Sequence, residues 1–507
     1  NMRVSAGTRS VLTPGAGLTR SVIVAGLLEM TGGTLSIAFT NANSATAETT
    51  RLEVNGSFMG IGGAVSISGN SAVGLDLALL DINGPATWSG TTATLNLATQ
   101  TRIDCLGHWT SAASFAPTTG TVRFEPAVSS TVTYATLPNV VVVSGVVTMT
   151  TTGTGAVLDL DVSAGVTLIT TQSIDVNGDL FLSPTAAWNF GAATPTINQD
   201  FTSVGAGLIG TGTLEFNGTG SIDAGTAGGQ LIPNMRVSAG TRSVLPPGAS
   251  GQTRSVVVAG LLEISGGTPS VAFTNINNAT VETARVIVNG SFMGTGGAVN
   301  LTGNAGVGLD LALLDINGPA TWSGTTATMT FQDHSRIECT GNWSSASSFA
   351  PAQGLVRFEP AVSSTVSYAT LPHVAVVSGI VTMTTTGTGA VLDLAVSGGA
   401  TLNTTQSIDV NGGVLLSPTA TWNFAAASPT VNQNWTSVGA VLMGTGTIVF
   451  DGTGSIDYGV AVGEAFPNMR VTAGTRSVLP PGATGQTRSV LVAGLLEVSG
   501  GTLSVAY

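Results

Sequence analysis

The stretch RVIVNGSFMGTGGAV, residues 285–299, contains the pattern that decides the fold of this chain. A β-branched run ends at Asn-Gly, and a second short apolar run ending in glycines follows it. Variants of the pattern recur as VVVAGLLEISGG from Val256, LDINGPATWSG from Leu314 and SIDVNGGVLLS from Ser407. Because β-branched residues favour strands, Asn-Gly favours tight turns and glycine disfavours helix, the pattern predicts many short strands joined by corners.

A much longer repeat lies outside this local pattern. The sequence NMRVSAGTRSVL begins at Asn1 and again at Asn234, and NMRVTAGTRSVL begins at Asn468. The period is therefore roughly 234 residues, far longer than the local pattern. Residues 75–94 recur unchanged as residues 309–328. We therefore predict three segments: copy 1 over residues 1–233, copy 2 over 234–467, and the start of copy 3 over 468–507, within an array that continues beyond this stretch.

The two periods together predict the fold class. The glycines that end the apolar runs divide one long repeat into nine steps, which is about 26 residues per step and is typical of one coil of a β-solenoid. Such a coil cannot bury its apolar side alone and must stack on its neighbours. The prediction is an all-β parallel β-solenoid, or β-helix. A string of β-sandwich domains is the alternative, with residues 245–248 and 479–482 as the best linker candidates.

Alternation along single strands predicts which side chains face inward. In RIDC, Arg102 and Asp104 lie on one side of the strand and Ile103 and Cys105 on the other, since successive side chains point to opposite faces. We expect charges outside and apolar residues inside. Cys105 and its copy Cys339 are then buried, unpaired small hydrophobes and not a disulfide.

The composition excludes several classes of function. Only 8% of the 507 residues are charged, against roughly 25% in an ordinary soluble domain, and all 15 basic residues are arginine. The net charge of −12 argues against nucleic acid as a partner, because phosphate binding needs a basic surface. Mean hydropathy is +0.40, but no run of about 20 apolar residues is present, so no membrane span is predicted in this segment.

The internal copies test each candidate catalytic residue. Each of the three histidines is replaced in the other copy: His108 corresponds to Asn342, His334 to Gln100 and His373 to Asn139. A histidine that acts as general base or metal ligand in every copy is thereby excluded. The repeated acids, such as Asp81 with Asp315, are scattered over different coils, whereas polysaccharide-cleaving enzymes need them in one groove.

The sequence therefore predicts no catalytic, cofactor-binding or metal-ligating residue, no cofactor and no enzyme. Calcium cannot be placed, since neither an EF-hand loop nor a GGxGxD repeat occurs. Asn55, Asn217 and Asn289 begin Asn-Gly-Ser or Asn-Gly-Thr triplets, which match glycan acceptors but which we interpret as solenoid corners.

The arginines recur between copies, and two interpretations remain open. They could form a docking ladder for an anionic ligand or partner along one face. Alternatively, they pair with nearby acids, Arg102 with Asp104 and Arg123 with Glu125, and fix the register of the coils. The second interpretation is favoured.

The runs VAGLLEISGGT from Val258 and GTGTLEFNGTGSI from Gly210 resemble the repeats of large secreted bacterial β-helix proteins, including autotransporter passengers and filamentous adhesins. The resemblance covers nearly the whole chain and is one of repeat style. It implies an extracellular or cell-surface location and carries no catalytic residue.

The expected function is structural. We predict an extracellular fibre, filament or sheath formed by end-to-end and lateral packing of solenoid rods, with self-association as the main partnership. The alternative is an adhesin stalk or surface-binding module with a cell surface or polysaccharide as partner. A polysaccharide-acting β-helix enzyme is the third and weakest hypothesis.

Overall fold

The computed structural model describes residues 1–505 except for a set of short gaps. These gaps are 15–17, 39–47, 70–75, 91–93, 98–99, 226–228, 247–251, 273–281, 304–309, 325–327, 332–333, 459–464 and 481–487. The linker candidates 245–248 and 479–482 fall partly outside the described residues. By their internal contacts the residues form two compact units, unit 1 over Asn1–Met235 and unit 2 over Arg236–Tyr507.

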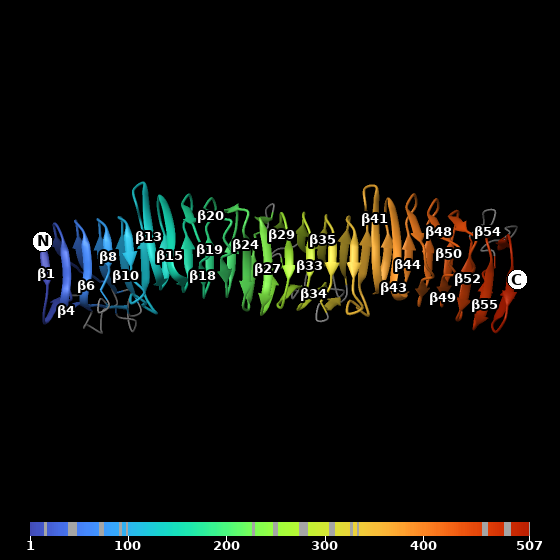
Figure 1. Cartoon of the computed structure of the whole chain (residues 1–507), viewed down its shortest axis with the longest axis horizontal. Helices are drawn as coiled ribbons and strands as arrows, with labels where there is room; N and C mark the ends of the chain where they lie inside the picture. Colours follow the sequence, from blue (N-terminus) through green and yellow to red (C-terminus); the bar gives the residue numbers. More distant parts are fainter. Residues whose placement is uncertain are drawn as a thin grey trace. The chain divides into compact units, whose positions relative to one another are not determined.

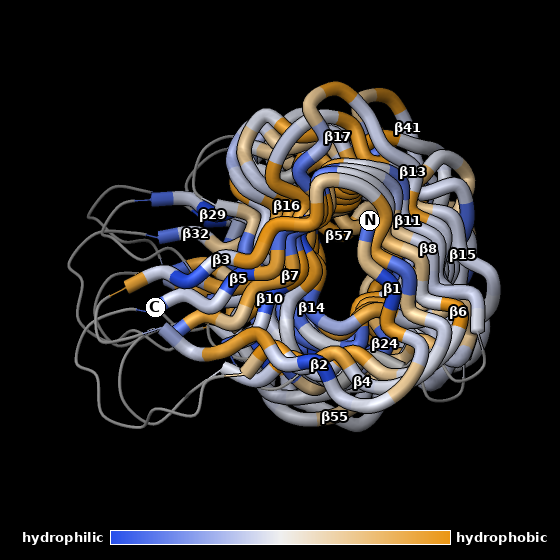
Figure 2. The backbone as a smooth tube through the Cα atoms, turned by 90° about the vertical axis from the view of Figure 1, so that its left-hand side faces the viewer, coloured by the Kyte–Doolittle hydropathy of each residue, from blue (hydrophilic) through white to orange (hydrophobic). Residues whose placement is uncertain are grey.

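Every regular element among the described residues is a β-strand, and in each unit the strands stack in parallel ladders (Figure 1). Three ladders make the three sides of a coil, so the predicted parallel β-solenoid is confirmed. Figure 2 looks along the stack of unit 1: β3, β5, β7 and β10 follow one another on one side, and β1, β8 and β11 on the opposite side.

In unit 1, the first ladder contains β1 (Met2–Val4), β4 (Leu28–Ala38), β6 (Phe58–Ser68), β8 (Ala86–Trp88), β11 (Trp109–Ser111), β13 (Ser129–Leu137), β15 (Val146–Val157), β17 (Thr167–Thr170), β20 (Ala187–Gly191) and β23 (Gly207–Gly210). The second contains β2 (Thr8–Val11), the distal halves of β4 and β6, β9 (Thr94–Leu97) and, beyond the end of β15, β18 (Asp175–Val176), β21 (Thr196–Ile197) and β24 (Thr213–Asn217). The third contains β3 (Thr19–Val24), β5 (Thr49–Val54), β7 (Leu77–Ile82), β10 (Thr101–Cys105), β12 (Thr121–Phe124), β14 (Asn139–Val142), β16 (Leu160–Val162), β19 (Leu180–Leu182), β22 (Phe201–Ser203) and β25 (Gly220–Asp223). β26 (Gln230–Ile232) and β27 (Asn234–Ala239) follow where the units meet in the sequence.

In unit 2, the first ladder contains β30 (Leu262–Ile264), β33 (Phe292–Gly294), β36 (Ala320–Trp322), β39 (Trp343–Ser345), β41 (Ser363–Leu371), β43 (Ile380–Val391), β45 (Thr401–Thr404), β48 (Thr421–Ala425) and β51 (Val441–Gly444). The second contains β28 (Thr241–Val244), β31 (Thr268–Ala272), β34 (Ala298–Thr302) and β37 (Thr328–Phe331), and, beyond the end of β43, β46 (Asp409–Val410), β49 (Thr430–Val431), β52 (Ile448–Asp451), β55 (Met469–Ala473) and β58 (Leu496–Val498). The third contains β29 (Thr253–Val258), β32 (Thr283–Val288), β35 (Leu311–Ile316), β38 (Ser335–Cys339), β40 (Leu355–Phe358), β42 (His373–Val376), β44 (Leu394–Val396), β47 (Val414–Leu416), β50 (Trp435–Ser437), β53 (Gly454–Asp457), β56 (Thr475–Val478) and β59 (Thr502–Val505). β54 (Ala465–Phe466) pairs with β57 (Leu491–Val492).

Coil length is not uniform, although the glycine spacing predicts an even spacing of the coils. In the third ladder of unit 1, Thr19 pairs with Thr49 across a long coil, whereas Thr121 pairs with Asn139 across a much shorter one. In unit 2 the third ladder runs from β29 to β56 in ten steps, so the prediction of nine coils of about 26 residues in one long repeat is wrong. Loops at the corners absorb the difference, because the ladder constrains only the residues that pair.

One long repeat is also not a whole number of coils. The sequence TRSV forms β28 in the second ladder of unit 2, and its copy in the next long repeat forms β56 in the third ladder. The chain therefore completes ten coils and moves on to the next side of the coil within one repeat. The copies nevertheless keep equivalent neighbours: β28 pairs with β31, and β56 pairs with β59, which repeats the corresponding sequence.

The interior of each unit is filled by aromatic and branched side chains. In unit 1, the rings of Phe58 and Trp88 lie 4.4 Å apart between centroids, and Phe115 lies 4.9 Å from Trp88. The backbone passes close to this stack, since a Cβ on Gly60 would lie 2.9 Å from Trp88 Cε3. Glycine is needed there because any side chain would displace the indole ring.

Asparagines at the corners pair from coil to coil. Asn83 Nδ2 donates to Asn55 Oδ1 at 2.7 Å, and Asn317 Nδ2 donates to Asn289 Oδ1 at 3.0 Å. The interpretation of Asn55 and Asn289 as corner residues is thus confirmed.

Candidate functional surface

The outward side of the third ladder carries the densest group of charges in unit 1. Glu53 of β5 pairs in register with Asp81 of β7, and Asp81 pairs with Asp104 of β10. Adjacent parallel strands lie about 4.8 Å apart, so three carboxylates would repel one another along this column. We call it the acidic column of unit 1.

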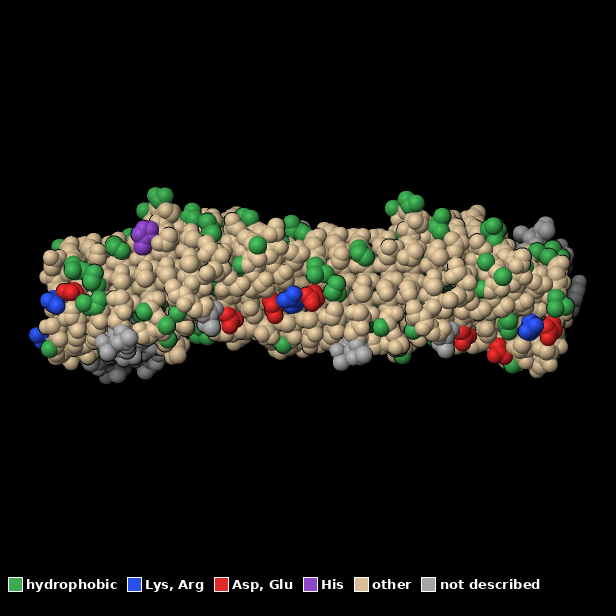
Figure 3. Space-filling view, viewed as in Figure 1, with side chains coloured by type: hydrophobic (Ala, Val, Ile, Leu, Met, Phe, Trp, Pro, Cys, Tyr) green, Lys and Arg blue, Asp and Glu red, His purple; other side chains and the backbone are tan. Residues whose placement is uncertain are grey.

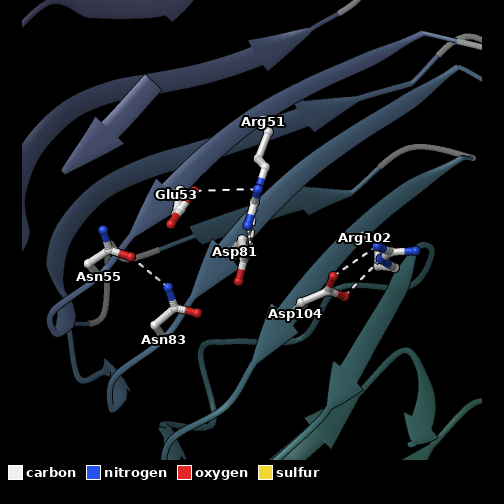
Figure 4. Close-up of polar contacts among 7 residues, drawn as sticks. All are labelled: Arg51, Glu53, Asn55, Asp81, Asn83, Arg102 and Asp104. Carbon is white, nitrogen blue, oxygen red and sulfur yellow. Dashed lines mark hydrogen bonds and ion pairs between the residues drawn. The ribbon is translucent and has the colours of Figure 1, made fainter. Parts of the chain in front are cut away.

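Arginines close to these acids neutralise the acidic column (Figure 4). Arg51 donates to Asp81, with Nε lying 3.1 Å from Oδ2, and its Nη1 lies 3.4 Å from Glu53. Arg102 contacts both oxygens of Asp104, at 2.8 and 2.9 Å. The hydrogen bond to Asp81 raises the pKa of Arg51, while burial raises the pKa of Asp104 despite the opposing effect of Arg102.

The corresponding column of unit 2 is arranged differently. Ile287 replaces Glu53, and Arg285 Nε donates to Ser255 Oγ at 2.9 Å. Glu338 is the best-paired acid here, and it accepts from Arg336 at 2.7 Å and Arg357 at 2.9 Å. Burial, together with the nearby charge of Glu338, raises the pKa of Asp315.

The structure settles how the arginines are used at these positions. The predicted pairs Arg102–Asp104 and Arg123–Glu125 are confirmed, at 2.8 and 2.7 Å. The expectation that all charges face outward is wrong for Arg242 and Arg476, which are fully buried in unit 2. The alternative of a docking ladder along one face is therefore excluded for these two arginines.

Arg476 shows how the interior accepts a guanidinium. Its Nη2 donates to the carbonyl oxygen of Val431 at 2.6 Å, Nη1 donates to that of Gln433, and the group lies 4.9 Å from the ring centre of Phe450. Burial lowers its pKa to about 10, so it stays charged at neutral pH. In TRSV the arginine lies on the same face of the strand as the valine, so alternation and the expectation that charges face outward conflict here, and that expectation is wrong.

The two cysteines are buried and unpaired, as predicted. Burial raises the pKa of both Cys105 and Cys339 to about 12. Since the thiolate is the reactive form, both thiols are inert near neutral pH.

His108 has a structural role that explains its replacement. Its Nδ1 accepts the backbone N–H of Thr131 at 3.0 Å, and in unit 2 Oδ1 of Asn342 accepts the N–H of Thr365 at 2.9 Å. Histidine and asparagine thus supply the same acceptor at this corner.

The other two histidines line one hollow of unit 2. This hollow, of about 410 Å³, is lined by Leu311, His334, Ser335, Arg336, Gln353, Gly354, Leu355 and His373, and we call it the unit 2 hollow. Its counterpart, the unit 1 hollow, has the same volume and includes Gln100, Arg102 and Asn139. Comparison of the copies excluded each histidine separately as a functional residue common to every copy. It did not show that His334 and His373 line the same hollow.

A second hollow of about 350 Å³ adjoins the unit 2 hollow. Leu355 and His373 line both hollows, and the second, which we call the adjoining hollow, extends over Asp393, Leu415 and Asn434. Its exposed lining is mainly apolar, and Asn434 and Thr436 supply an amide and a hydroxyl group.

Metal-binding clusters, membrane-spanning helices and similarity to known proteins also bear on the function of this chain. Across the described residues no three His, Cys, Asp or Glu side chains gather closely enough to hold a metal ion. In the same part of the chain there is no helix with the length and apolar character needed to cross a bilayer. Comparison of the chain with protein-family models, with curated proteins and with solved structures found no match.

Proposed function

We propose that this chain is a structural repeat protein that self-associates into an extracellular fibre, filament or sheath through end-to-end and lateral packing of solenoid rods. The observation that carries the proposal is that exposed apolar side chains recur at matching positions in both units. Val128 and Val362 are 78% and 75% exposed. The other matched pairs are Met59 with Met293, Phe181 with Leu415, and Ile209 with Met443.

Repeated exposed apolar groups favour a repeated contact, because their burial in a partner removes apolar surface from water. The low charge of the surface supports the same proposal. On the face drawn in Figure 3, charged side chains occupy only a few small spots. Paired charges of the kind seen around Arg51 add little repulsion between neighbouring molecules.

The test compares two double variants whose substitutions lie at adjacent positions in each unit. Val128→Asn with Val362→Asn removes the apolar groups, and Ser129→Asn with Ser363→Asn changes the exposed neighbours as a control. Sedimentation velocity and electron microscopy should find assemblies for the native chain and the serine variant, and fewer or shorter ones for the valine variant. A native chain that stays monomeric at all concentrations would contradict the proposal.

A surface-binding module or adhesin stalk is the second candidate. The unit 2 hollow and the adjoining hollow favour it, because together they follow seven strands of one ladder and are lined by groups that hydrogen-bond to sugars. Retention of the native chain on immobilised polysaccharides, and loss of retention in Asn434→Ala, would support this candidate. We propose no enzymatic activity, since Asp81 and its two neighbours in the acidic column, Glu53 and Asp104, each contact an arginine.

A further inference from the structure

Asn-Gly pairs form several corners of the coils, and the glycines of these pairs are of two kinds. In the first kind, the glycine N–H is bonded. Gly178 and Gly412 are buried, and each donates to a backbone carbonyl oxygen on the preceding coil at 2.5 Å. A nitrogen held in this way is not free to turn toward another group. We call the asparagines that precede these glycines, Asn177 and Asn411, the closed asparagines.

In the second kind, the glycine N–H is free and only half-buried. Within the described residues no acceptor bonds the backbone N–H of Gly56, Gly84, Gly290 or Gly318. We call the preceding residues, Asn55, Asn83, Asn289 and Asn317, the open asparagines. Asn217, the last residue of β24, belongs to neither group.

Stacking of the coils requires glycine at the open corners. A Cβ on Gly84 would collide with the carbonyl oxygen of Gly56, and a Cβ on Gly318 would collide with that of Gly290. Because glycine has no side chain to shield its backbone nitrogen, that nitrogen can approach the side chain of the residue before it. The fold thus places beside each open asparagine the residue that most readily lets an asparagine react with its own backbone.

The two asparagines of each open pair are not equivalent. Asn83 Nδ2 donates to Oδ1 of Asn55 at 2.7 Å (Figure 4), and Asn317 Nδ2 donates to Oδ1 of Asn289 at 3.0 Å. The donor polarises the side-chain carbonyl of Asn55 or Asn289. It would also stabilise the negative charge that gathers on this oxygen when a nucleophile adds to Cγ.

We propose that Asn55 and Asn289 are sites of spontaneous deamidation, each promoted by the asparagine of the next coil, Asn83 or Asn317. The backbone nitrogen of Gly56 attacks Cγ of Asn55 and gives up its proton to the departing nitrogen. The Cγ–Nδ2 bond breaks, ammonia leaves and a succinimide forms. Water then opens the ring at either carbonyl, which produces aspartate or isoaspartate. Asn83 is a positioning residue, because it acts through the carbonyl oxygen of Asn55.

The aspartate product keeps the contact between the coils. A carboxylate at position 55 still accepts from Nδ2 of Asn83, and a hydrogen bond to a charged acceptor is stronger than one to an amide. The same reaction at Asn83 would instead remove the donor and place a carboxylate against the carbonyl oxygen of Asn55. Deamidation at the first site therefore leaves the corner intact and adds one negative charge to it.

The experiment incubates the full chain in warm, mildly alkaline buffer prepared with heavy-oxygen water. Tandem mass spectrometry then measures heavy-oxygen uptake at each asparagine. Asn55 and Asn289 should react at least about threefold faster than Asn83 and Asn317, because only the first two have a donor on the side-chain carbonyl. The closed asparagines should react most slowly. In guanidinium the differences between sites should disappear, since the folded corners create them.

Two variants test the role of the donor, and unit 2 is the internal control. Asn83→Ala should slow the reaction at Asn55 at least about threefold and leave Asn289 at its native rate. Asn83→Asp should also slow it, because a carboxylate opposes negative charge on the oxygen of Asn55. The proposal is overturned if Asn55 reacts no faster than Asn177 in the folded chain. It is also overturned if both variants, with native circular dichroism spectra, leave the rate at Asn55 unchanged.

Discussion

The Phe–Trp stacks inside the two units are nearly identical, whereas their outer charged columns differ. Phe58 and Trp88 lie 4.4 Å apart at 39°, and Phe292 and Trp322 lie 4.5 Å apart at 41°. On the outside, Arg51 binds Asp81 in unit 1, while the equivalent Arg285 binds Ser255 in unit 2.

This contrast follows from what each side must satisfy. Interior side chains are packed at the density of organic crystals, so a change at one ring is felt by the next coil. Outer pairs are partly solvated and each contributes only about 0 to 1 kcal/mol. A single outer replacement, Ile287 for Glu53, can therefore redirect an arginine without disturbing the fold.

The largest expected effect comes from the shared interior. Trp88→Ala and Trp322→Ala should each destabilise their own coils by about 3 to 5 kcal/mol, because each leaves a large cavity beside its phenylalanine. Guanidinium unfolding followed by tryptophan fluorescence measures the loss. Because the stacks match, the two losses should agree to within about 1 kcal/mol.

The outward neighbours Thr87 and Thr321 provide the control for this pair, and their replacement by alanine should cost less than about 0.5 kcal/mol. A difference of several kcal/mol between the two tryptophan variants would show that the interiors are not energetically equivalent.

Removal of the equivalent arginine should cost more stability in the acidic column of unit 1 than in the corresponding column of unit 2, and both losses should be smaller than those of the tryptophan variants. Arg51→Met leaves Asp81, whose side chain is 10% exposed, without its guanidinium and should cost about 1 to 2 kcal/mol. Arg285→Met loses a bond to a hydroxyl and should cost about 0.5 kcal/mol or less. Thermal unfolding at low salt measures both.

Measuring Arg285→Met in a chain that also carries Ile287→Glu tests the difference between the two outer columns more directly. When Ile287→Glu restores the acid that unit 1 carries, Arg285→Met should cost more than it does in the native chain. Equal costs with and without Glu at position 287 would contradict the view that neighbouring coils decide the pairing.

The smallest effect concerns the pH dependence of unit 2. Burial raises the pKa of Asp315, so the folded chain takes up this proton at a higher pH than the unfolded chain. The stability contributed at Asp315 is thus greatest at low pH and is lost as the pH rises through the raised value.

Asp315→Asn should accordingly stabilise unit 2 at pH 7 by less than about 1 kcal/mol, with no difference from the native chain near pH 3. Denaturant unfolding between these values measures the slope. In unit 1, Asp81→Asn should instead destabilise at pH 7, because Arg51 loses its charged partner. A destabilised Asp315→Asn variant at pH 7 would show that Asp315 is favourably paired.

Sequence reasoning reached the parts of this structure that depend on neighbours along the chain. Alternation placed Ile103 and Cys105 inside and paired Arg102 with Asp104, since all four lie on one strand. It failed at Arg476, whose partners Val431 and Gln433 lie on earlier coils. It also missed the shared hollow of His334 and His373, because comparison of copies tests one position at a time.

The sequence by itself determined that the chain forms strands, that one side of each is apolar, and that the coils must stack to bury it. Only the tertiary structure decided how many residues each coil takes, which ladder a repeated strand joins, and which acid an arginine meets. The physical reason is that strand formation and alternation are local, while the register between coils depends on corner loops of variable length. A shift of one side of the coil in each repeat places TRSV in a different ladder, although it pairs with the corresponding following sequence each time.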